Sequence, residues 1–163
     1  MKVEMQLQGV DGVLDMLRKL PAEVVSKRGG PVKLALAKGA RFLRDRAKEN
    51  LRRQIARGPT TRSTGGLEER VISSRGKAPF GGKGERYLVR VRKRDYVNAD
   101  GVKTNPLMTA NLLEYGSGHQ PAYPWLRPVV PAHGEKVIQM VTKDLGDRVE
   151  KLARKLARGG LAG

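Results

Sequence analysis

The sequence contains no cysteine in 163 residues, and its only aromatic residues are one Trp, two Phe and four Tyr. Disulfide scaffolds and thiol chemistry are therefore excluded, and a packed core has to be built mainly from aliphatic side chains. A structural zinc site would need four ligands, and two histidines supply too few. No nucleotide-binding loop and no nucleophile motif occurs either. We therefore expect no metal, no cofactor and no enzymatic activity.

Long apolar runs are missing as well. No segment reaches the roughly 18 consecutive apolar residues that a membrane span needs, so we expect no membrane partner. The first ten residues, MKVEMQLQGV, lack the apolar stretch of a secretory signal, so we expect synthesis in the cytosol. The length suits a single domain over residues 1–163.

Acidic residues are scarce compared with basic ones. The chain has 33 Lys and Arg against 16 Asp and Glu, which gives a formal net charge of +17. A field of that sign attracts polyanions and opposes self-association unless a partner neutralises it. Nucleic acid, an acidic protein ring or an anionic surface would each do so. A basic surface that only keeps the protein soluble is the simpler alternative.

Hydrophobic periodicity predicts three strands and two short helical segments around a first long helix. Residues 2–8 alternate as a half-buried strand, and residues 11–20 suit a short helix. A long helix begins at Pro31 and is stopped by Gly58-Pro59. Its apolar stripe consists of Val32, Leu36, Ala40, Leu43, Ala47, Leu51 and Ile55. Residues 67–74 suit a turn of helix that passes into a strand, and residues 87–94 form the second clear strand.

Two groups of basic residues are candidates for contact with a polyanion or an acidic partner. The first lies on the long helix: Arg41, Arg44, Lys48, Arg52 and Arg53. The second is Arg90, Arg92 and Arg94, which share one face of the predicted strand about 6.5–7 Å apart. Alternatively, each group is simply a face exposed to solvent. On the helix, the Glu49–Arg53 pair would reduce the repulsion between the like charges. The lack of aromatic residues among the arginines favours a solvent face or a subunit contact over DNA.

Three segments rich in turn-forming residues are expected to be loops, at residues 57–66, 75–85 and 97–109. The last of them leads to residues 111–132, NLLEYGSGHQPAYPWLRPVVPA, which contain the only Trp and four of the nine Pro. Gly116 is placed to end a short helix in a left-handed conformation. Because Pro121, Pro124, Pro128 and Pro131 favour extended backbone, we call residues 117–131 the strap. A final amphipathic helix follows over residues 132–158.

These elements predict an α+β fold, in which a small, mainly antiparallel sheet packs against two long amphipathic helices. Within the strap, Trp125 is either part of the core or an anchor at an interface, and the core is favoured in a chain so poor in aromatics. Glu114 and Arg127 suit a structural ion pair that ties the helix end to the strap. His119 and His133 are expected to be ordinary polar residues.

The strap and the residues before it resemble the signature of the tail-completion, or neck, family of long-tailed phages. The matching residues are Glu114-Tyr115-Gly116-Ser117 and then Pro121-Ala122-Tyr123-Pro124-Trp125-Leu126-Arg127-Pro128, followed by an amphipathic helix. A weaker match is Thr64-Gly65-Gly66-Leu67, and the resemblance covers roughly the last hundred residues. Ser117 stands where Thr is usual, and Val129 where Ala is usual.

The resemblance implies a structural virion protein that completes the tail and joins it to the head. It would form a homo-oligomeric, hexameric ring between the tail terminator and the head connector, through which DNA passes, and it would be found in the virion neck and, during assembly, in the host cytoplasm. The interface residues would then be Glu114, Tyr115, Gly116, Pro121, Pro124, Trp125, Leu126, Arg127 and Pro128.

Two alternatives come from other classes of protein. A sequence-independent nucleic-acid-binding protein would account for the charge of +17. A small basic nuclease of toxin type would use His119, Glu114 and arginines. Neither alternative requires the sequence of the strap.

Overall fold

The computed structural model describes residues 15, 30–57, 65–77 and 85–159. The strand expected at residues 2–8, most of the helix expected at 11–20 and most of the two loops expected at 57–66 and 75–85 lie outside these residues. The chain divides into two compact units, one of Met1–Gly39 with Lys136–Gly163 and one of Ala40–Glu135. Each is described separately. Together the described elements confirm the α+β class.

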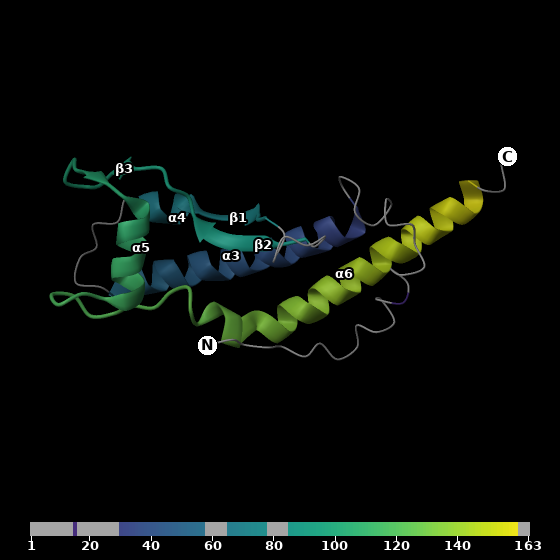
Figure 1. The fold of residues 1–163 in the computed structure, drawn as a ribbon. Helices are drawn as coiled ribbons and strands as arrows, with labels where there is room; N and C mark the ends of the chain where they lie inside the picture. The colour runs from purple at the N-terminus through teal and green to yellow at the C-terminus, as the bar shows by residue number, and fades with distance from the viewer. Residues whose placement is uncertain (1–14, 16–29, 58–64, 78–84, 160–163) are drawn as a thin grey trace. The chain divides into compact units, whose positions relative to one another are not determined.

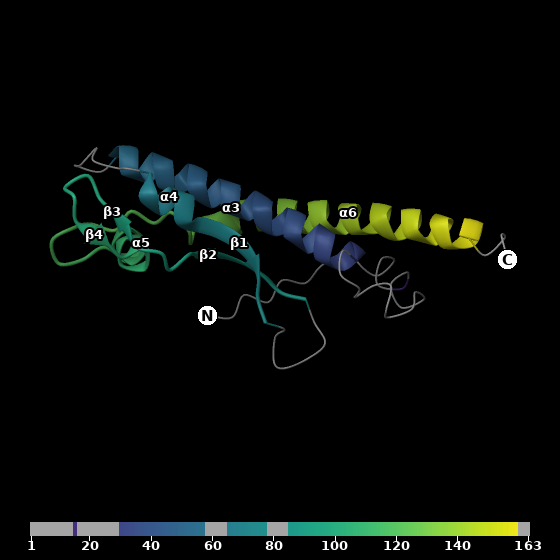
Figure 2. The same cartoon turned by 90° about the horizontal axis from the view of Figure 1, so that it is seen from above.

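The unit Ala40–Glu135 is built on the second part of α3 (Pro31–Arg57). After it come α4 (Gly66–Arg70), β1 (Val71–Arg75) and β2 (Tyr87–Val91), and the two strands pair antiparallel. The predicted passage from helix to strand at residues 67–74 is therefore confirmed. Figures 1 and 2 show α4 and the two strands alongside α3, with α5 at the C-terminal end of α3.

The core of this unit is formed by residues from almost every element. Its buried members are Ala47, Leu51, Leu67, Val71, Ala110, Trp125 and Val129, and Val89 and Val91 of β2 pack against it. Because Val71 and Val91 are direct partners in the sheet, they share one face. Burial of this aliphatic surface around one Trp is the main stabilising term available to the unit.

The prediction of a loop over residues 97–109 is wrong. Tyr96–Val97 (β3) and Lys103–Thr104 (β4) form a short antiparallel hairpin, and α5 (Pro106–Tyr115) begins directly after it. The side chain of Asn98 accepts hydrogen bonds from Asp100 N and Val102 N inside the turn. Asn105 accepts from Leu107 N at 2.9 Å, so Asn105-Pro106 is a helix N-cap followed by proline at the first helical position.

Only the middle of the strap lacks regular structure and turns. Ser117 and Gln120 form an isolated antiparallel bridge, residues 121–124 have no regular structure, and α6 (Val129–Gly159) begins three residues before the expected start. The prediction of extended backbone up to Pro131 is therefore wrong. A proline in the first turn of a helix loses no hydrogen bond, because the first N–H groups have no partner within the helix.

The other unit contains the first part of α3 and most of α6. The two helices approach closely at Gly39, where an added Cβ would lie 2.5 Å from Val141 Cγ2. Asp144 accepts from Lys38 Nζ at 2.7 Å and from Arg148 Nε at 2.5 Å. The hydrogen bond from Arg148 and the one from Lys38 outweigh burial and lower the pKa of Asp144.

Candidate assembly site

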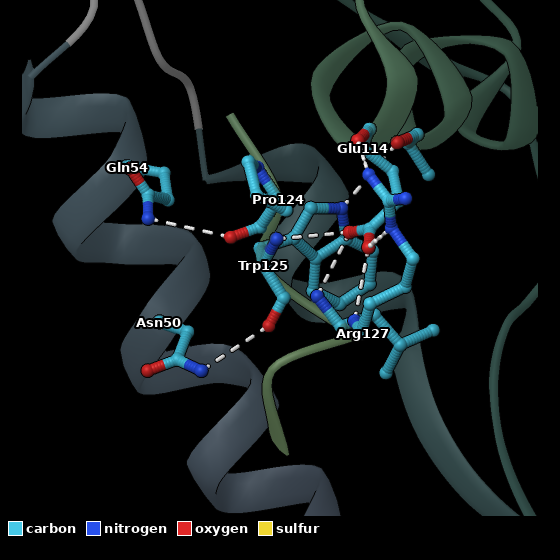
Figure 3. Close-up of polar contacts among 8 residues, drawn as sticks. Asn50, Gln54, Glu114, Pro124, Trp125 and Arg127 are labelled. Carbon is cyan, nitrogen blue, oxygen red and sulfur yellow. Dashed lines mark hydrogen bonds and ion pairs between the residues drawn. The ribbon is translucent and has the colours of Figure 1, made fainter. Parts of the chain in front are cut away.

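The strap is held by one buried carboxylate, that of Glu114 in the last turn of α5. Glu114 Oε2 accepts from the backbone N–H groups of Trp125 at 2.9 Å and Leu126 at 2.8 Å. Oε1 accepts from the backbone N–H and from Nε of Arg127, both at 2.9 Å. Figure 3 shows these contacts converging on the carboxylate. Three consecutive amides outside any regular element thus obtain their acceptors from a single side chain.

Arg127 contacts Glu114 from the solvent-exposed side. Its Nη2 donates to the backbone oxygen of Glu114 at 2.8 Å, and its guanidinium carbon lies 4.8 Å from the centre of the Tyr115 ring. The expected ion pair between Glu114 and Arg127 is confirmed at 2.9 Å. The guanidinium fork therefore joins the end of α5 to the strap through a carboxylate, a carbonyl and an aromatic face.

Trp125 is part of the core, with 2% of its surface exposed. Its Nε1 donates to Ala110 O at 3.3 Å, so the polar atom of the buried ring has a partner in α5. On the other side, Asn50 and Gln54 of α3 donate to the backbone oxygens of Trp125 and Pro124, each at 3.3 Å. The strap is thus fixed between α3 and α5, and the core alternative for Trp125 is the one that the structure supports.

Gly116 allows the chain to turn from α5 into the strap. Its φ of 74° is positive as expected, but its ψ of −171° lies outside the left-handed helical region. That combination is adopted almost only by glycine. A Cβ here would lie 2.7 Å from Gln120 O and 2.8 Å from Ala122 N. Both the backbone conformation and the close approach of the strap therefore require glycine.

Only some of the remaining strap residues face outward. Pro121, Ala122 and Pro128 are exposed, while Pro124 and Leu126 are partly buried. Beside the strap, the outer face of α5 forms an open groove of about 500 Å³ lined by Met108, Asn111, Leu112, Tyr115 and Gly116. Met108 and Tyr115 are 65% and 64% exposed, which is high for large apolar side chains. The surface around the strap is thus a mixture of proline and exposed apolar groups.

The basic residues expected on α3 are largely paired within the chain. Arg44 bonds Asp45, and Arg53 bonds Glu49. Arg52 holds Glu68 of α4 through two hydrogen bonds of 2.9 and 2.5 Å. The hydrogen bond from Arg52 outweighs burial and, with the charge of Lys48 nearby, lowers the pKa of Glu68. Arg41 is exposed. The contact of this face with a polyanion stays a prediction.

The prediction that three arginines share one face of a strand is wrong. β2 ends at Val91, so only Arg90 lies in the strand. The backbone N–H of Arg94 donates to Arg92 O at 2.9 Å, which makes a tight turn and ends the alternation of side chains. Arg90, Arg92 and Arg94 are nevertheless all exposed.

The histidines take no part in the Glu114 arrangement. His119 is exposed in the turn of residues 117–120, and its N–H donates to Ser117 Oγ at 3.3 Å. His133 packs edge-on against Phe42, with ring centres 6.0 Å apart. Both oxygens of Glu114 already accept two hydrogen bonds each. This geometry gives no support to Glu114 as a catalytic base.

Among residues 15, 30–57, 65–77 and 85–159, no group of three or more His, Asp or Glu could hold a metal ion. None of the helices in these ranges is both long and apolar enough to cross a membrane. Comparison of the chain with family models, curated proteins and solved structures finds no significant match in any of the three.

The Glu114 carboxylate gives a specific pH dependence. Burial raises the pKa of Glu114, but the three backbone N–H groups and Arg127 together lower it below its ordinary value. Its contribution to stability is therefore complete above the pKa of an unfolded glutamate, about 4.3, and is lost as the pH falls through the lower folded pKa.

We expect the difference in unfolding free energy between the wild type and Glu114→Gln to be constant near neutral pH and to shrink below about pH 4. Urea denaturation of both proteins at a series of pH values measures it. Asp144 and Glu68 also make stability depend on pH, but both proteins retain them, so their effects cancel in the difference. A difference that stays the same down to about pH 3 would contradict the proposed role of the carboxylate.

Proposed function

We propose that this chain is a tail-completion protein of a long-tailed phage, a structural protein of the neck that joins the tail to the filled head. It acts as a homo-oligomeric, hexameric ring between the tail terminator and the head connector, with DNA passing through the ring. The strap and the outer face of α5 supply its contacts. The resemblance in sequence at residues 114–128 carries this proposal.

The geometry of the strap supports it. The residues that make the sequence signature also contact one another. Glu114 accepts hydrogen bonds from residues 125–127, the backbone of Gly116 lies close to that of residues 120 and 122, and the Arg127 guanidinium lies over the Tyr115 ring. The signature covers the end of α5 and residues 125–127, and in the structure these two segments form one unit. Such a unit is a reason for these residue types to occur together at this spacing.

The same geometry suits assembly. A ring is closed by contacts between two different surfaces of identical subunits, and the strap offers an outward row that includes Pro121, Ala122 and Pro128. Because its backbone is already fixed by Glu114, Asn50 and Gln54, docking costs little conformational entropy. The exposed apolar groove on α5 gives a neighbour surface to bury.

Deletion of the gene from its phage tests the proposed function. Electron micrographs of lysates should then show DNA-filled heads and complete tails that are not attached to one another. Expression of the wild-type protein from a plasmid should restore joined particles. Joined, infectious particles in the absence of the gene would contradict the neck role.

The plasmid also allows a matched pair of variants. Ala122→Glu places a charge on the exposed strap, and Ala99→Glu places the same charge on an exposed turn of the β3–β4 hairpin. We expect Ala99→Glu to restore joined particles and Ala122→Glu to fail, with both proteins folded. If both variants restore joining equally, the strap is not the contact surface, although the neck role itself would stand.

A further inference from the structure

Some basic side chains of the described residues have an acidic partner within the chain, and others have none. Several arginines have such a partner, as Arg52 of α3 has Glu68 and Arg75 of β1 has Glu85. In contrast, no carboxylate of the described residues is within ion-pair distance of the four cations between positions 90 and 94. These are Arg90, Arg92, Lys93 and Arg94, and all four are exposed. The nearest acid in sequence, Asp95, lies 3.5 Å from Lys103.

The backbone that carries these cations is fixed by Arg70 of α4. Arg70 Nε donates to Arg94 O at 2.5 Å, and Nη2 donates to Asp95 O at 3.4 Å. Its guanidinium carbon also lies 4.8 Å from the centre of the Tyr96 ring. In return, Arg92 N–H donates to Arg70 O at 2.8 Å. One arginine is thus directed inward, and it holds a turn from which the others are directed to solvent.

We propose that residues 90–94 form a contact surface for the backbone phosphates of duplex DNA. Guanidinium groups match phosphate oxygens with paired hydrogen bonds, and a duplex presents about one negative charge per 1.7 Å of its axis. Four cations in five residues suit such a dense row of charge. Because Arg70 fixes the backbone beforehand, little entropy is lost when the side chains meet phosphates.

The composition of the surface separates duplex DNA from other polyanions. None of the four cations is next to an exposed aromatic residue within 90–94, whereas single strands are usually bound by stacking. Phosphate contacts to a duplex need no stacking, so the lack of aromatic residues, which in the sequence favoured a solvent face or a subunit contact, argues against single-stranded DNA and not against a duplex. The only apolar residue of the segment, Val91, packs against the core, so the segment lacks the apolar centre of a protein interface. The expected binding is therefore independent of base sequence. It does not depend on the proposed function.

Fluorescence anisotropy with a labelled duplex of about 30 base pairs, long enough to cover several phosphate contacts, tests this surface in the full-length protein. We expect wild-type affinity to fall linearly with log salt. Arg90→Gln/Arg92→Gln/Arg94→Gln should weaken binding at least about tenfold at low salt. It should also reduce the slope of log affinity against log salt by about 0.9 for each phosphate that the variant no longer neutralises.

A variant of equal charge change gives the control. Lys143→Gln/Lys151→Gln/Lys155→Gln removes three exposed cations from α6 and should retain most of the affinity and slope. Thermal unfolding checks that both variants are folded. Equal losses in the two variants would assign the binding to net charge alone and overturn the proposal. Binding to polyglutamate without binding to the duplex would overturn it as well, in favour of an acidic protein partner.

Discussion

Glu114→Ala should lower the free energy of unfolding by about 3–5 kcal/mol. The substitution leaves three backbone N–H groups, those of residues 125–127, without their acceptor, and an unsatisfied buried donor costs about 1–3 kcal/mol. Trp125 N is buried, while the other two are partly buried and can be hydrated in part. Urea denaturation with a fluorescence signal from the single Trp measures the change.

The control for this change is Glu69→Ala. The carboxylate of Glu69 is 80% exposed and lies 3.7 Å from Arg70, so its removal should change stability by no more than about 0.5 kcal/mol. The two variants lose the same charge and the same side chain, and they differ only in what the carboxylate contacts. Equal effects would mean that the Glu114 hydrogen bonds do not stabilise the fold.

Gly116→Ala should lower the free energy of unfolding by about 3 kcal/mol or more, a larger loss than we expect from Gly101→Ala or Gly118→Ala. The backbone conformation alone costs a residue with a side chain about 1–3 kcal/mol. In addition, the new methyl group would lie 2.7 Å from a backbone oxygen, that of Gln120, which cannot rotate away. Relief requires the strap to move, and such crowding typically costs a further 1–3 kcal/mol or so. Denaturation by urea measures the loss.

Two other glycines separate the cost of backbone strain from the cost of crowding by the added methyl group. Gly101 has φ of 77° and nothing within 4 Å of an added Cβ, so Gly101→Ala should cost only about 1–2 kcal/mol of backbone strain. Gly118 has open space and no positive φ, so Gly118→Ala should be neutral to within about 0.5 kcal/mol. If Gly116→Ala costs no more than Gly101→Ala, the close approach of the strap does not limit this position.

The long helices are predictable because their apolar residues recur every three or four positions. The pattern misses Ala35 and Gly39, which are buried on α3 although the predicted stripe does not include them. Small residues contribute little to a hydrophobic pattern, but at Gly39 small size is what lets Val141 approach. The strands at 71–75 and 87–91 follow from alternation, which strands of two residues such as β3 and β4 are too short to show.

The contacts of the site are harder to predict because they join distant positions. An acid and an arginine in one short signature suggest the pair of Glu114 and Arg127, but nothing in the sequence indicates the three backbone donors. The inward role of Arg70 is equally hidden, since an arginine at the end of a short helix resembles any solvated cation. Asn105-Pro106 does carry a local signal, a helix N-cap followed by proline, but the same two residues are also typical of a turn.

The central arrangement in the molecule is a strap whose backbone is held by one carboxylate. Hydrogen exchange of individual amides tests it most directly, because Trp125, Leu126 and Arg127 lie outside regular secondary structure and donate only to Glu114 among the residues described. In the wild type these three amides should exchange far more slowly than that of Ala122, and in Glu114→Gln the protection should largely disappear. Amides at 125–127 that exchange as fast as Ala122 in the wild type would contradict the arrangement.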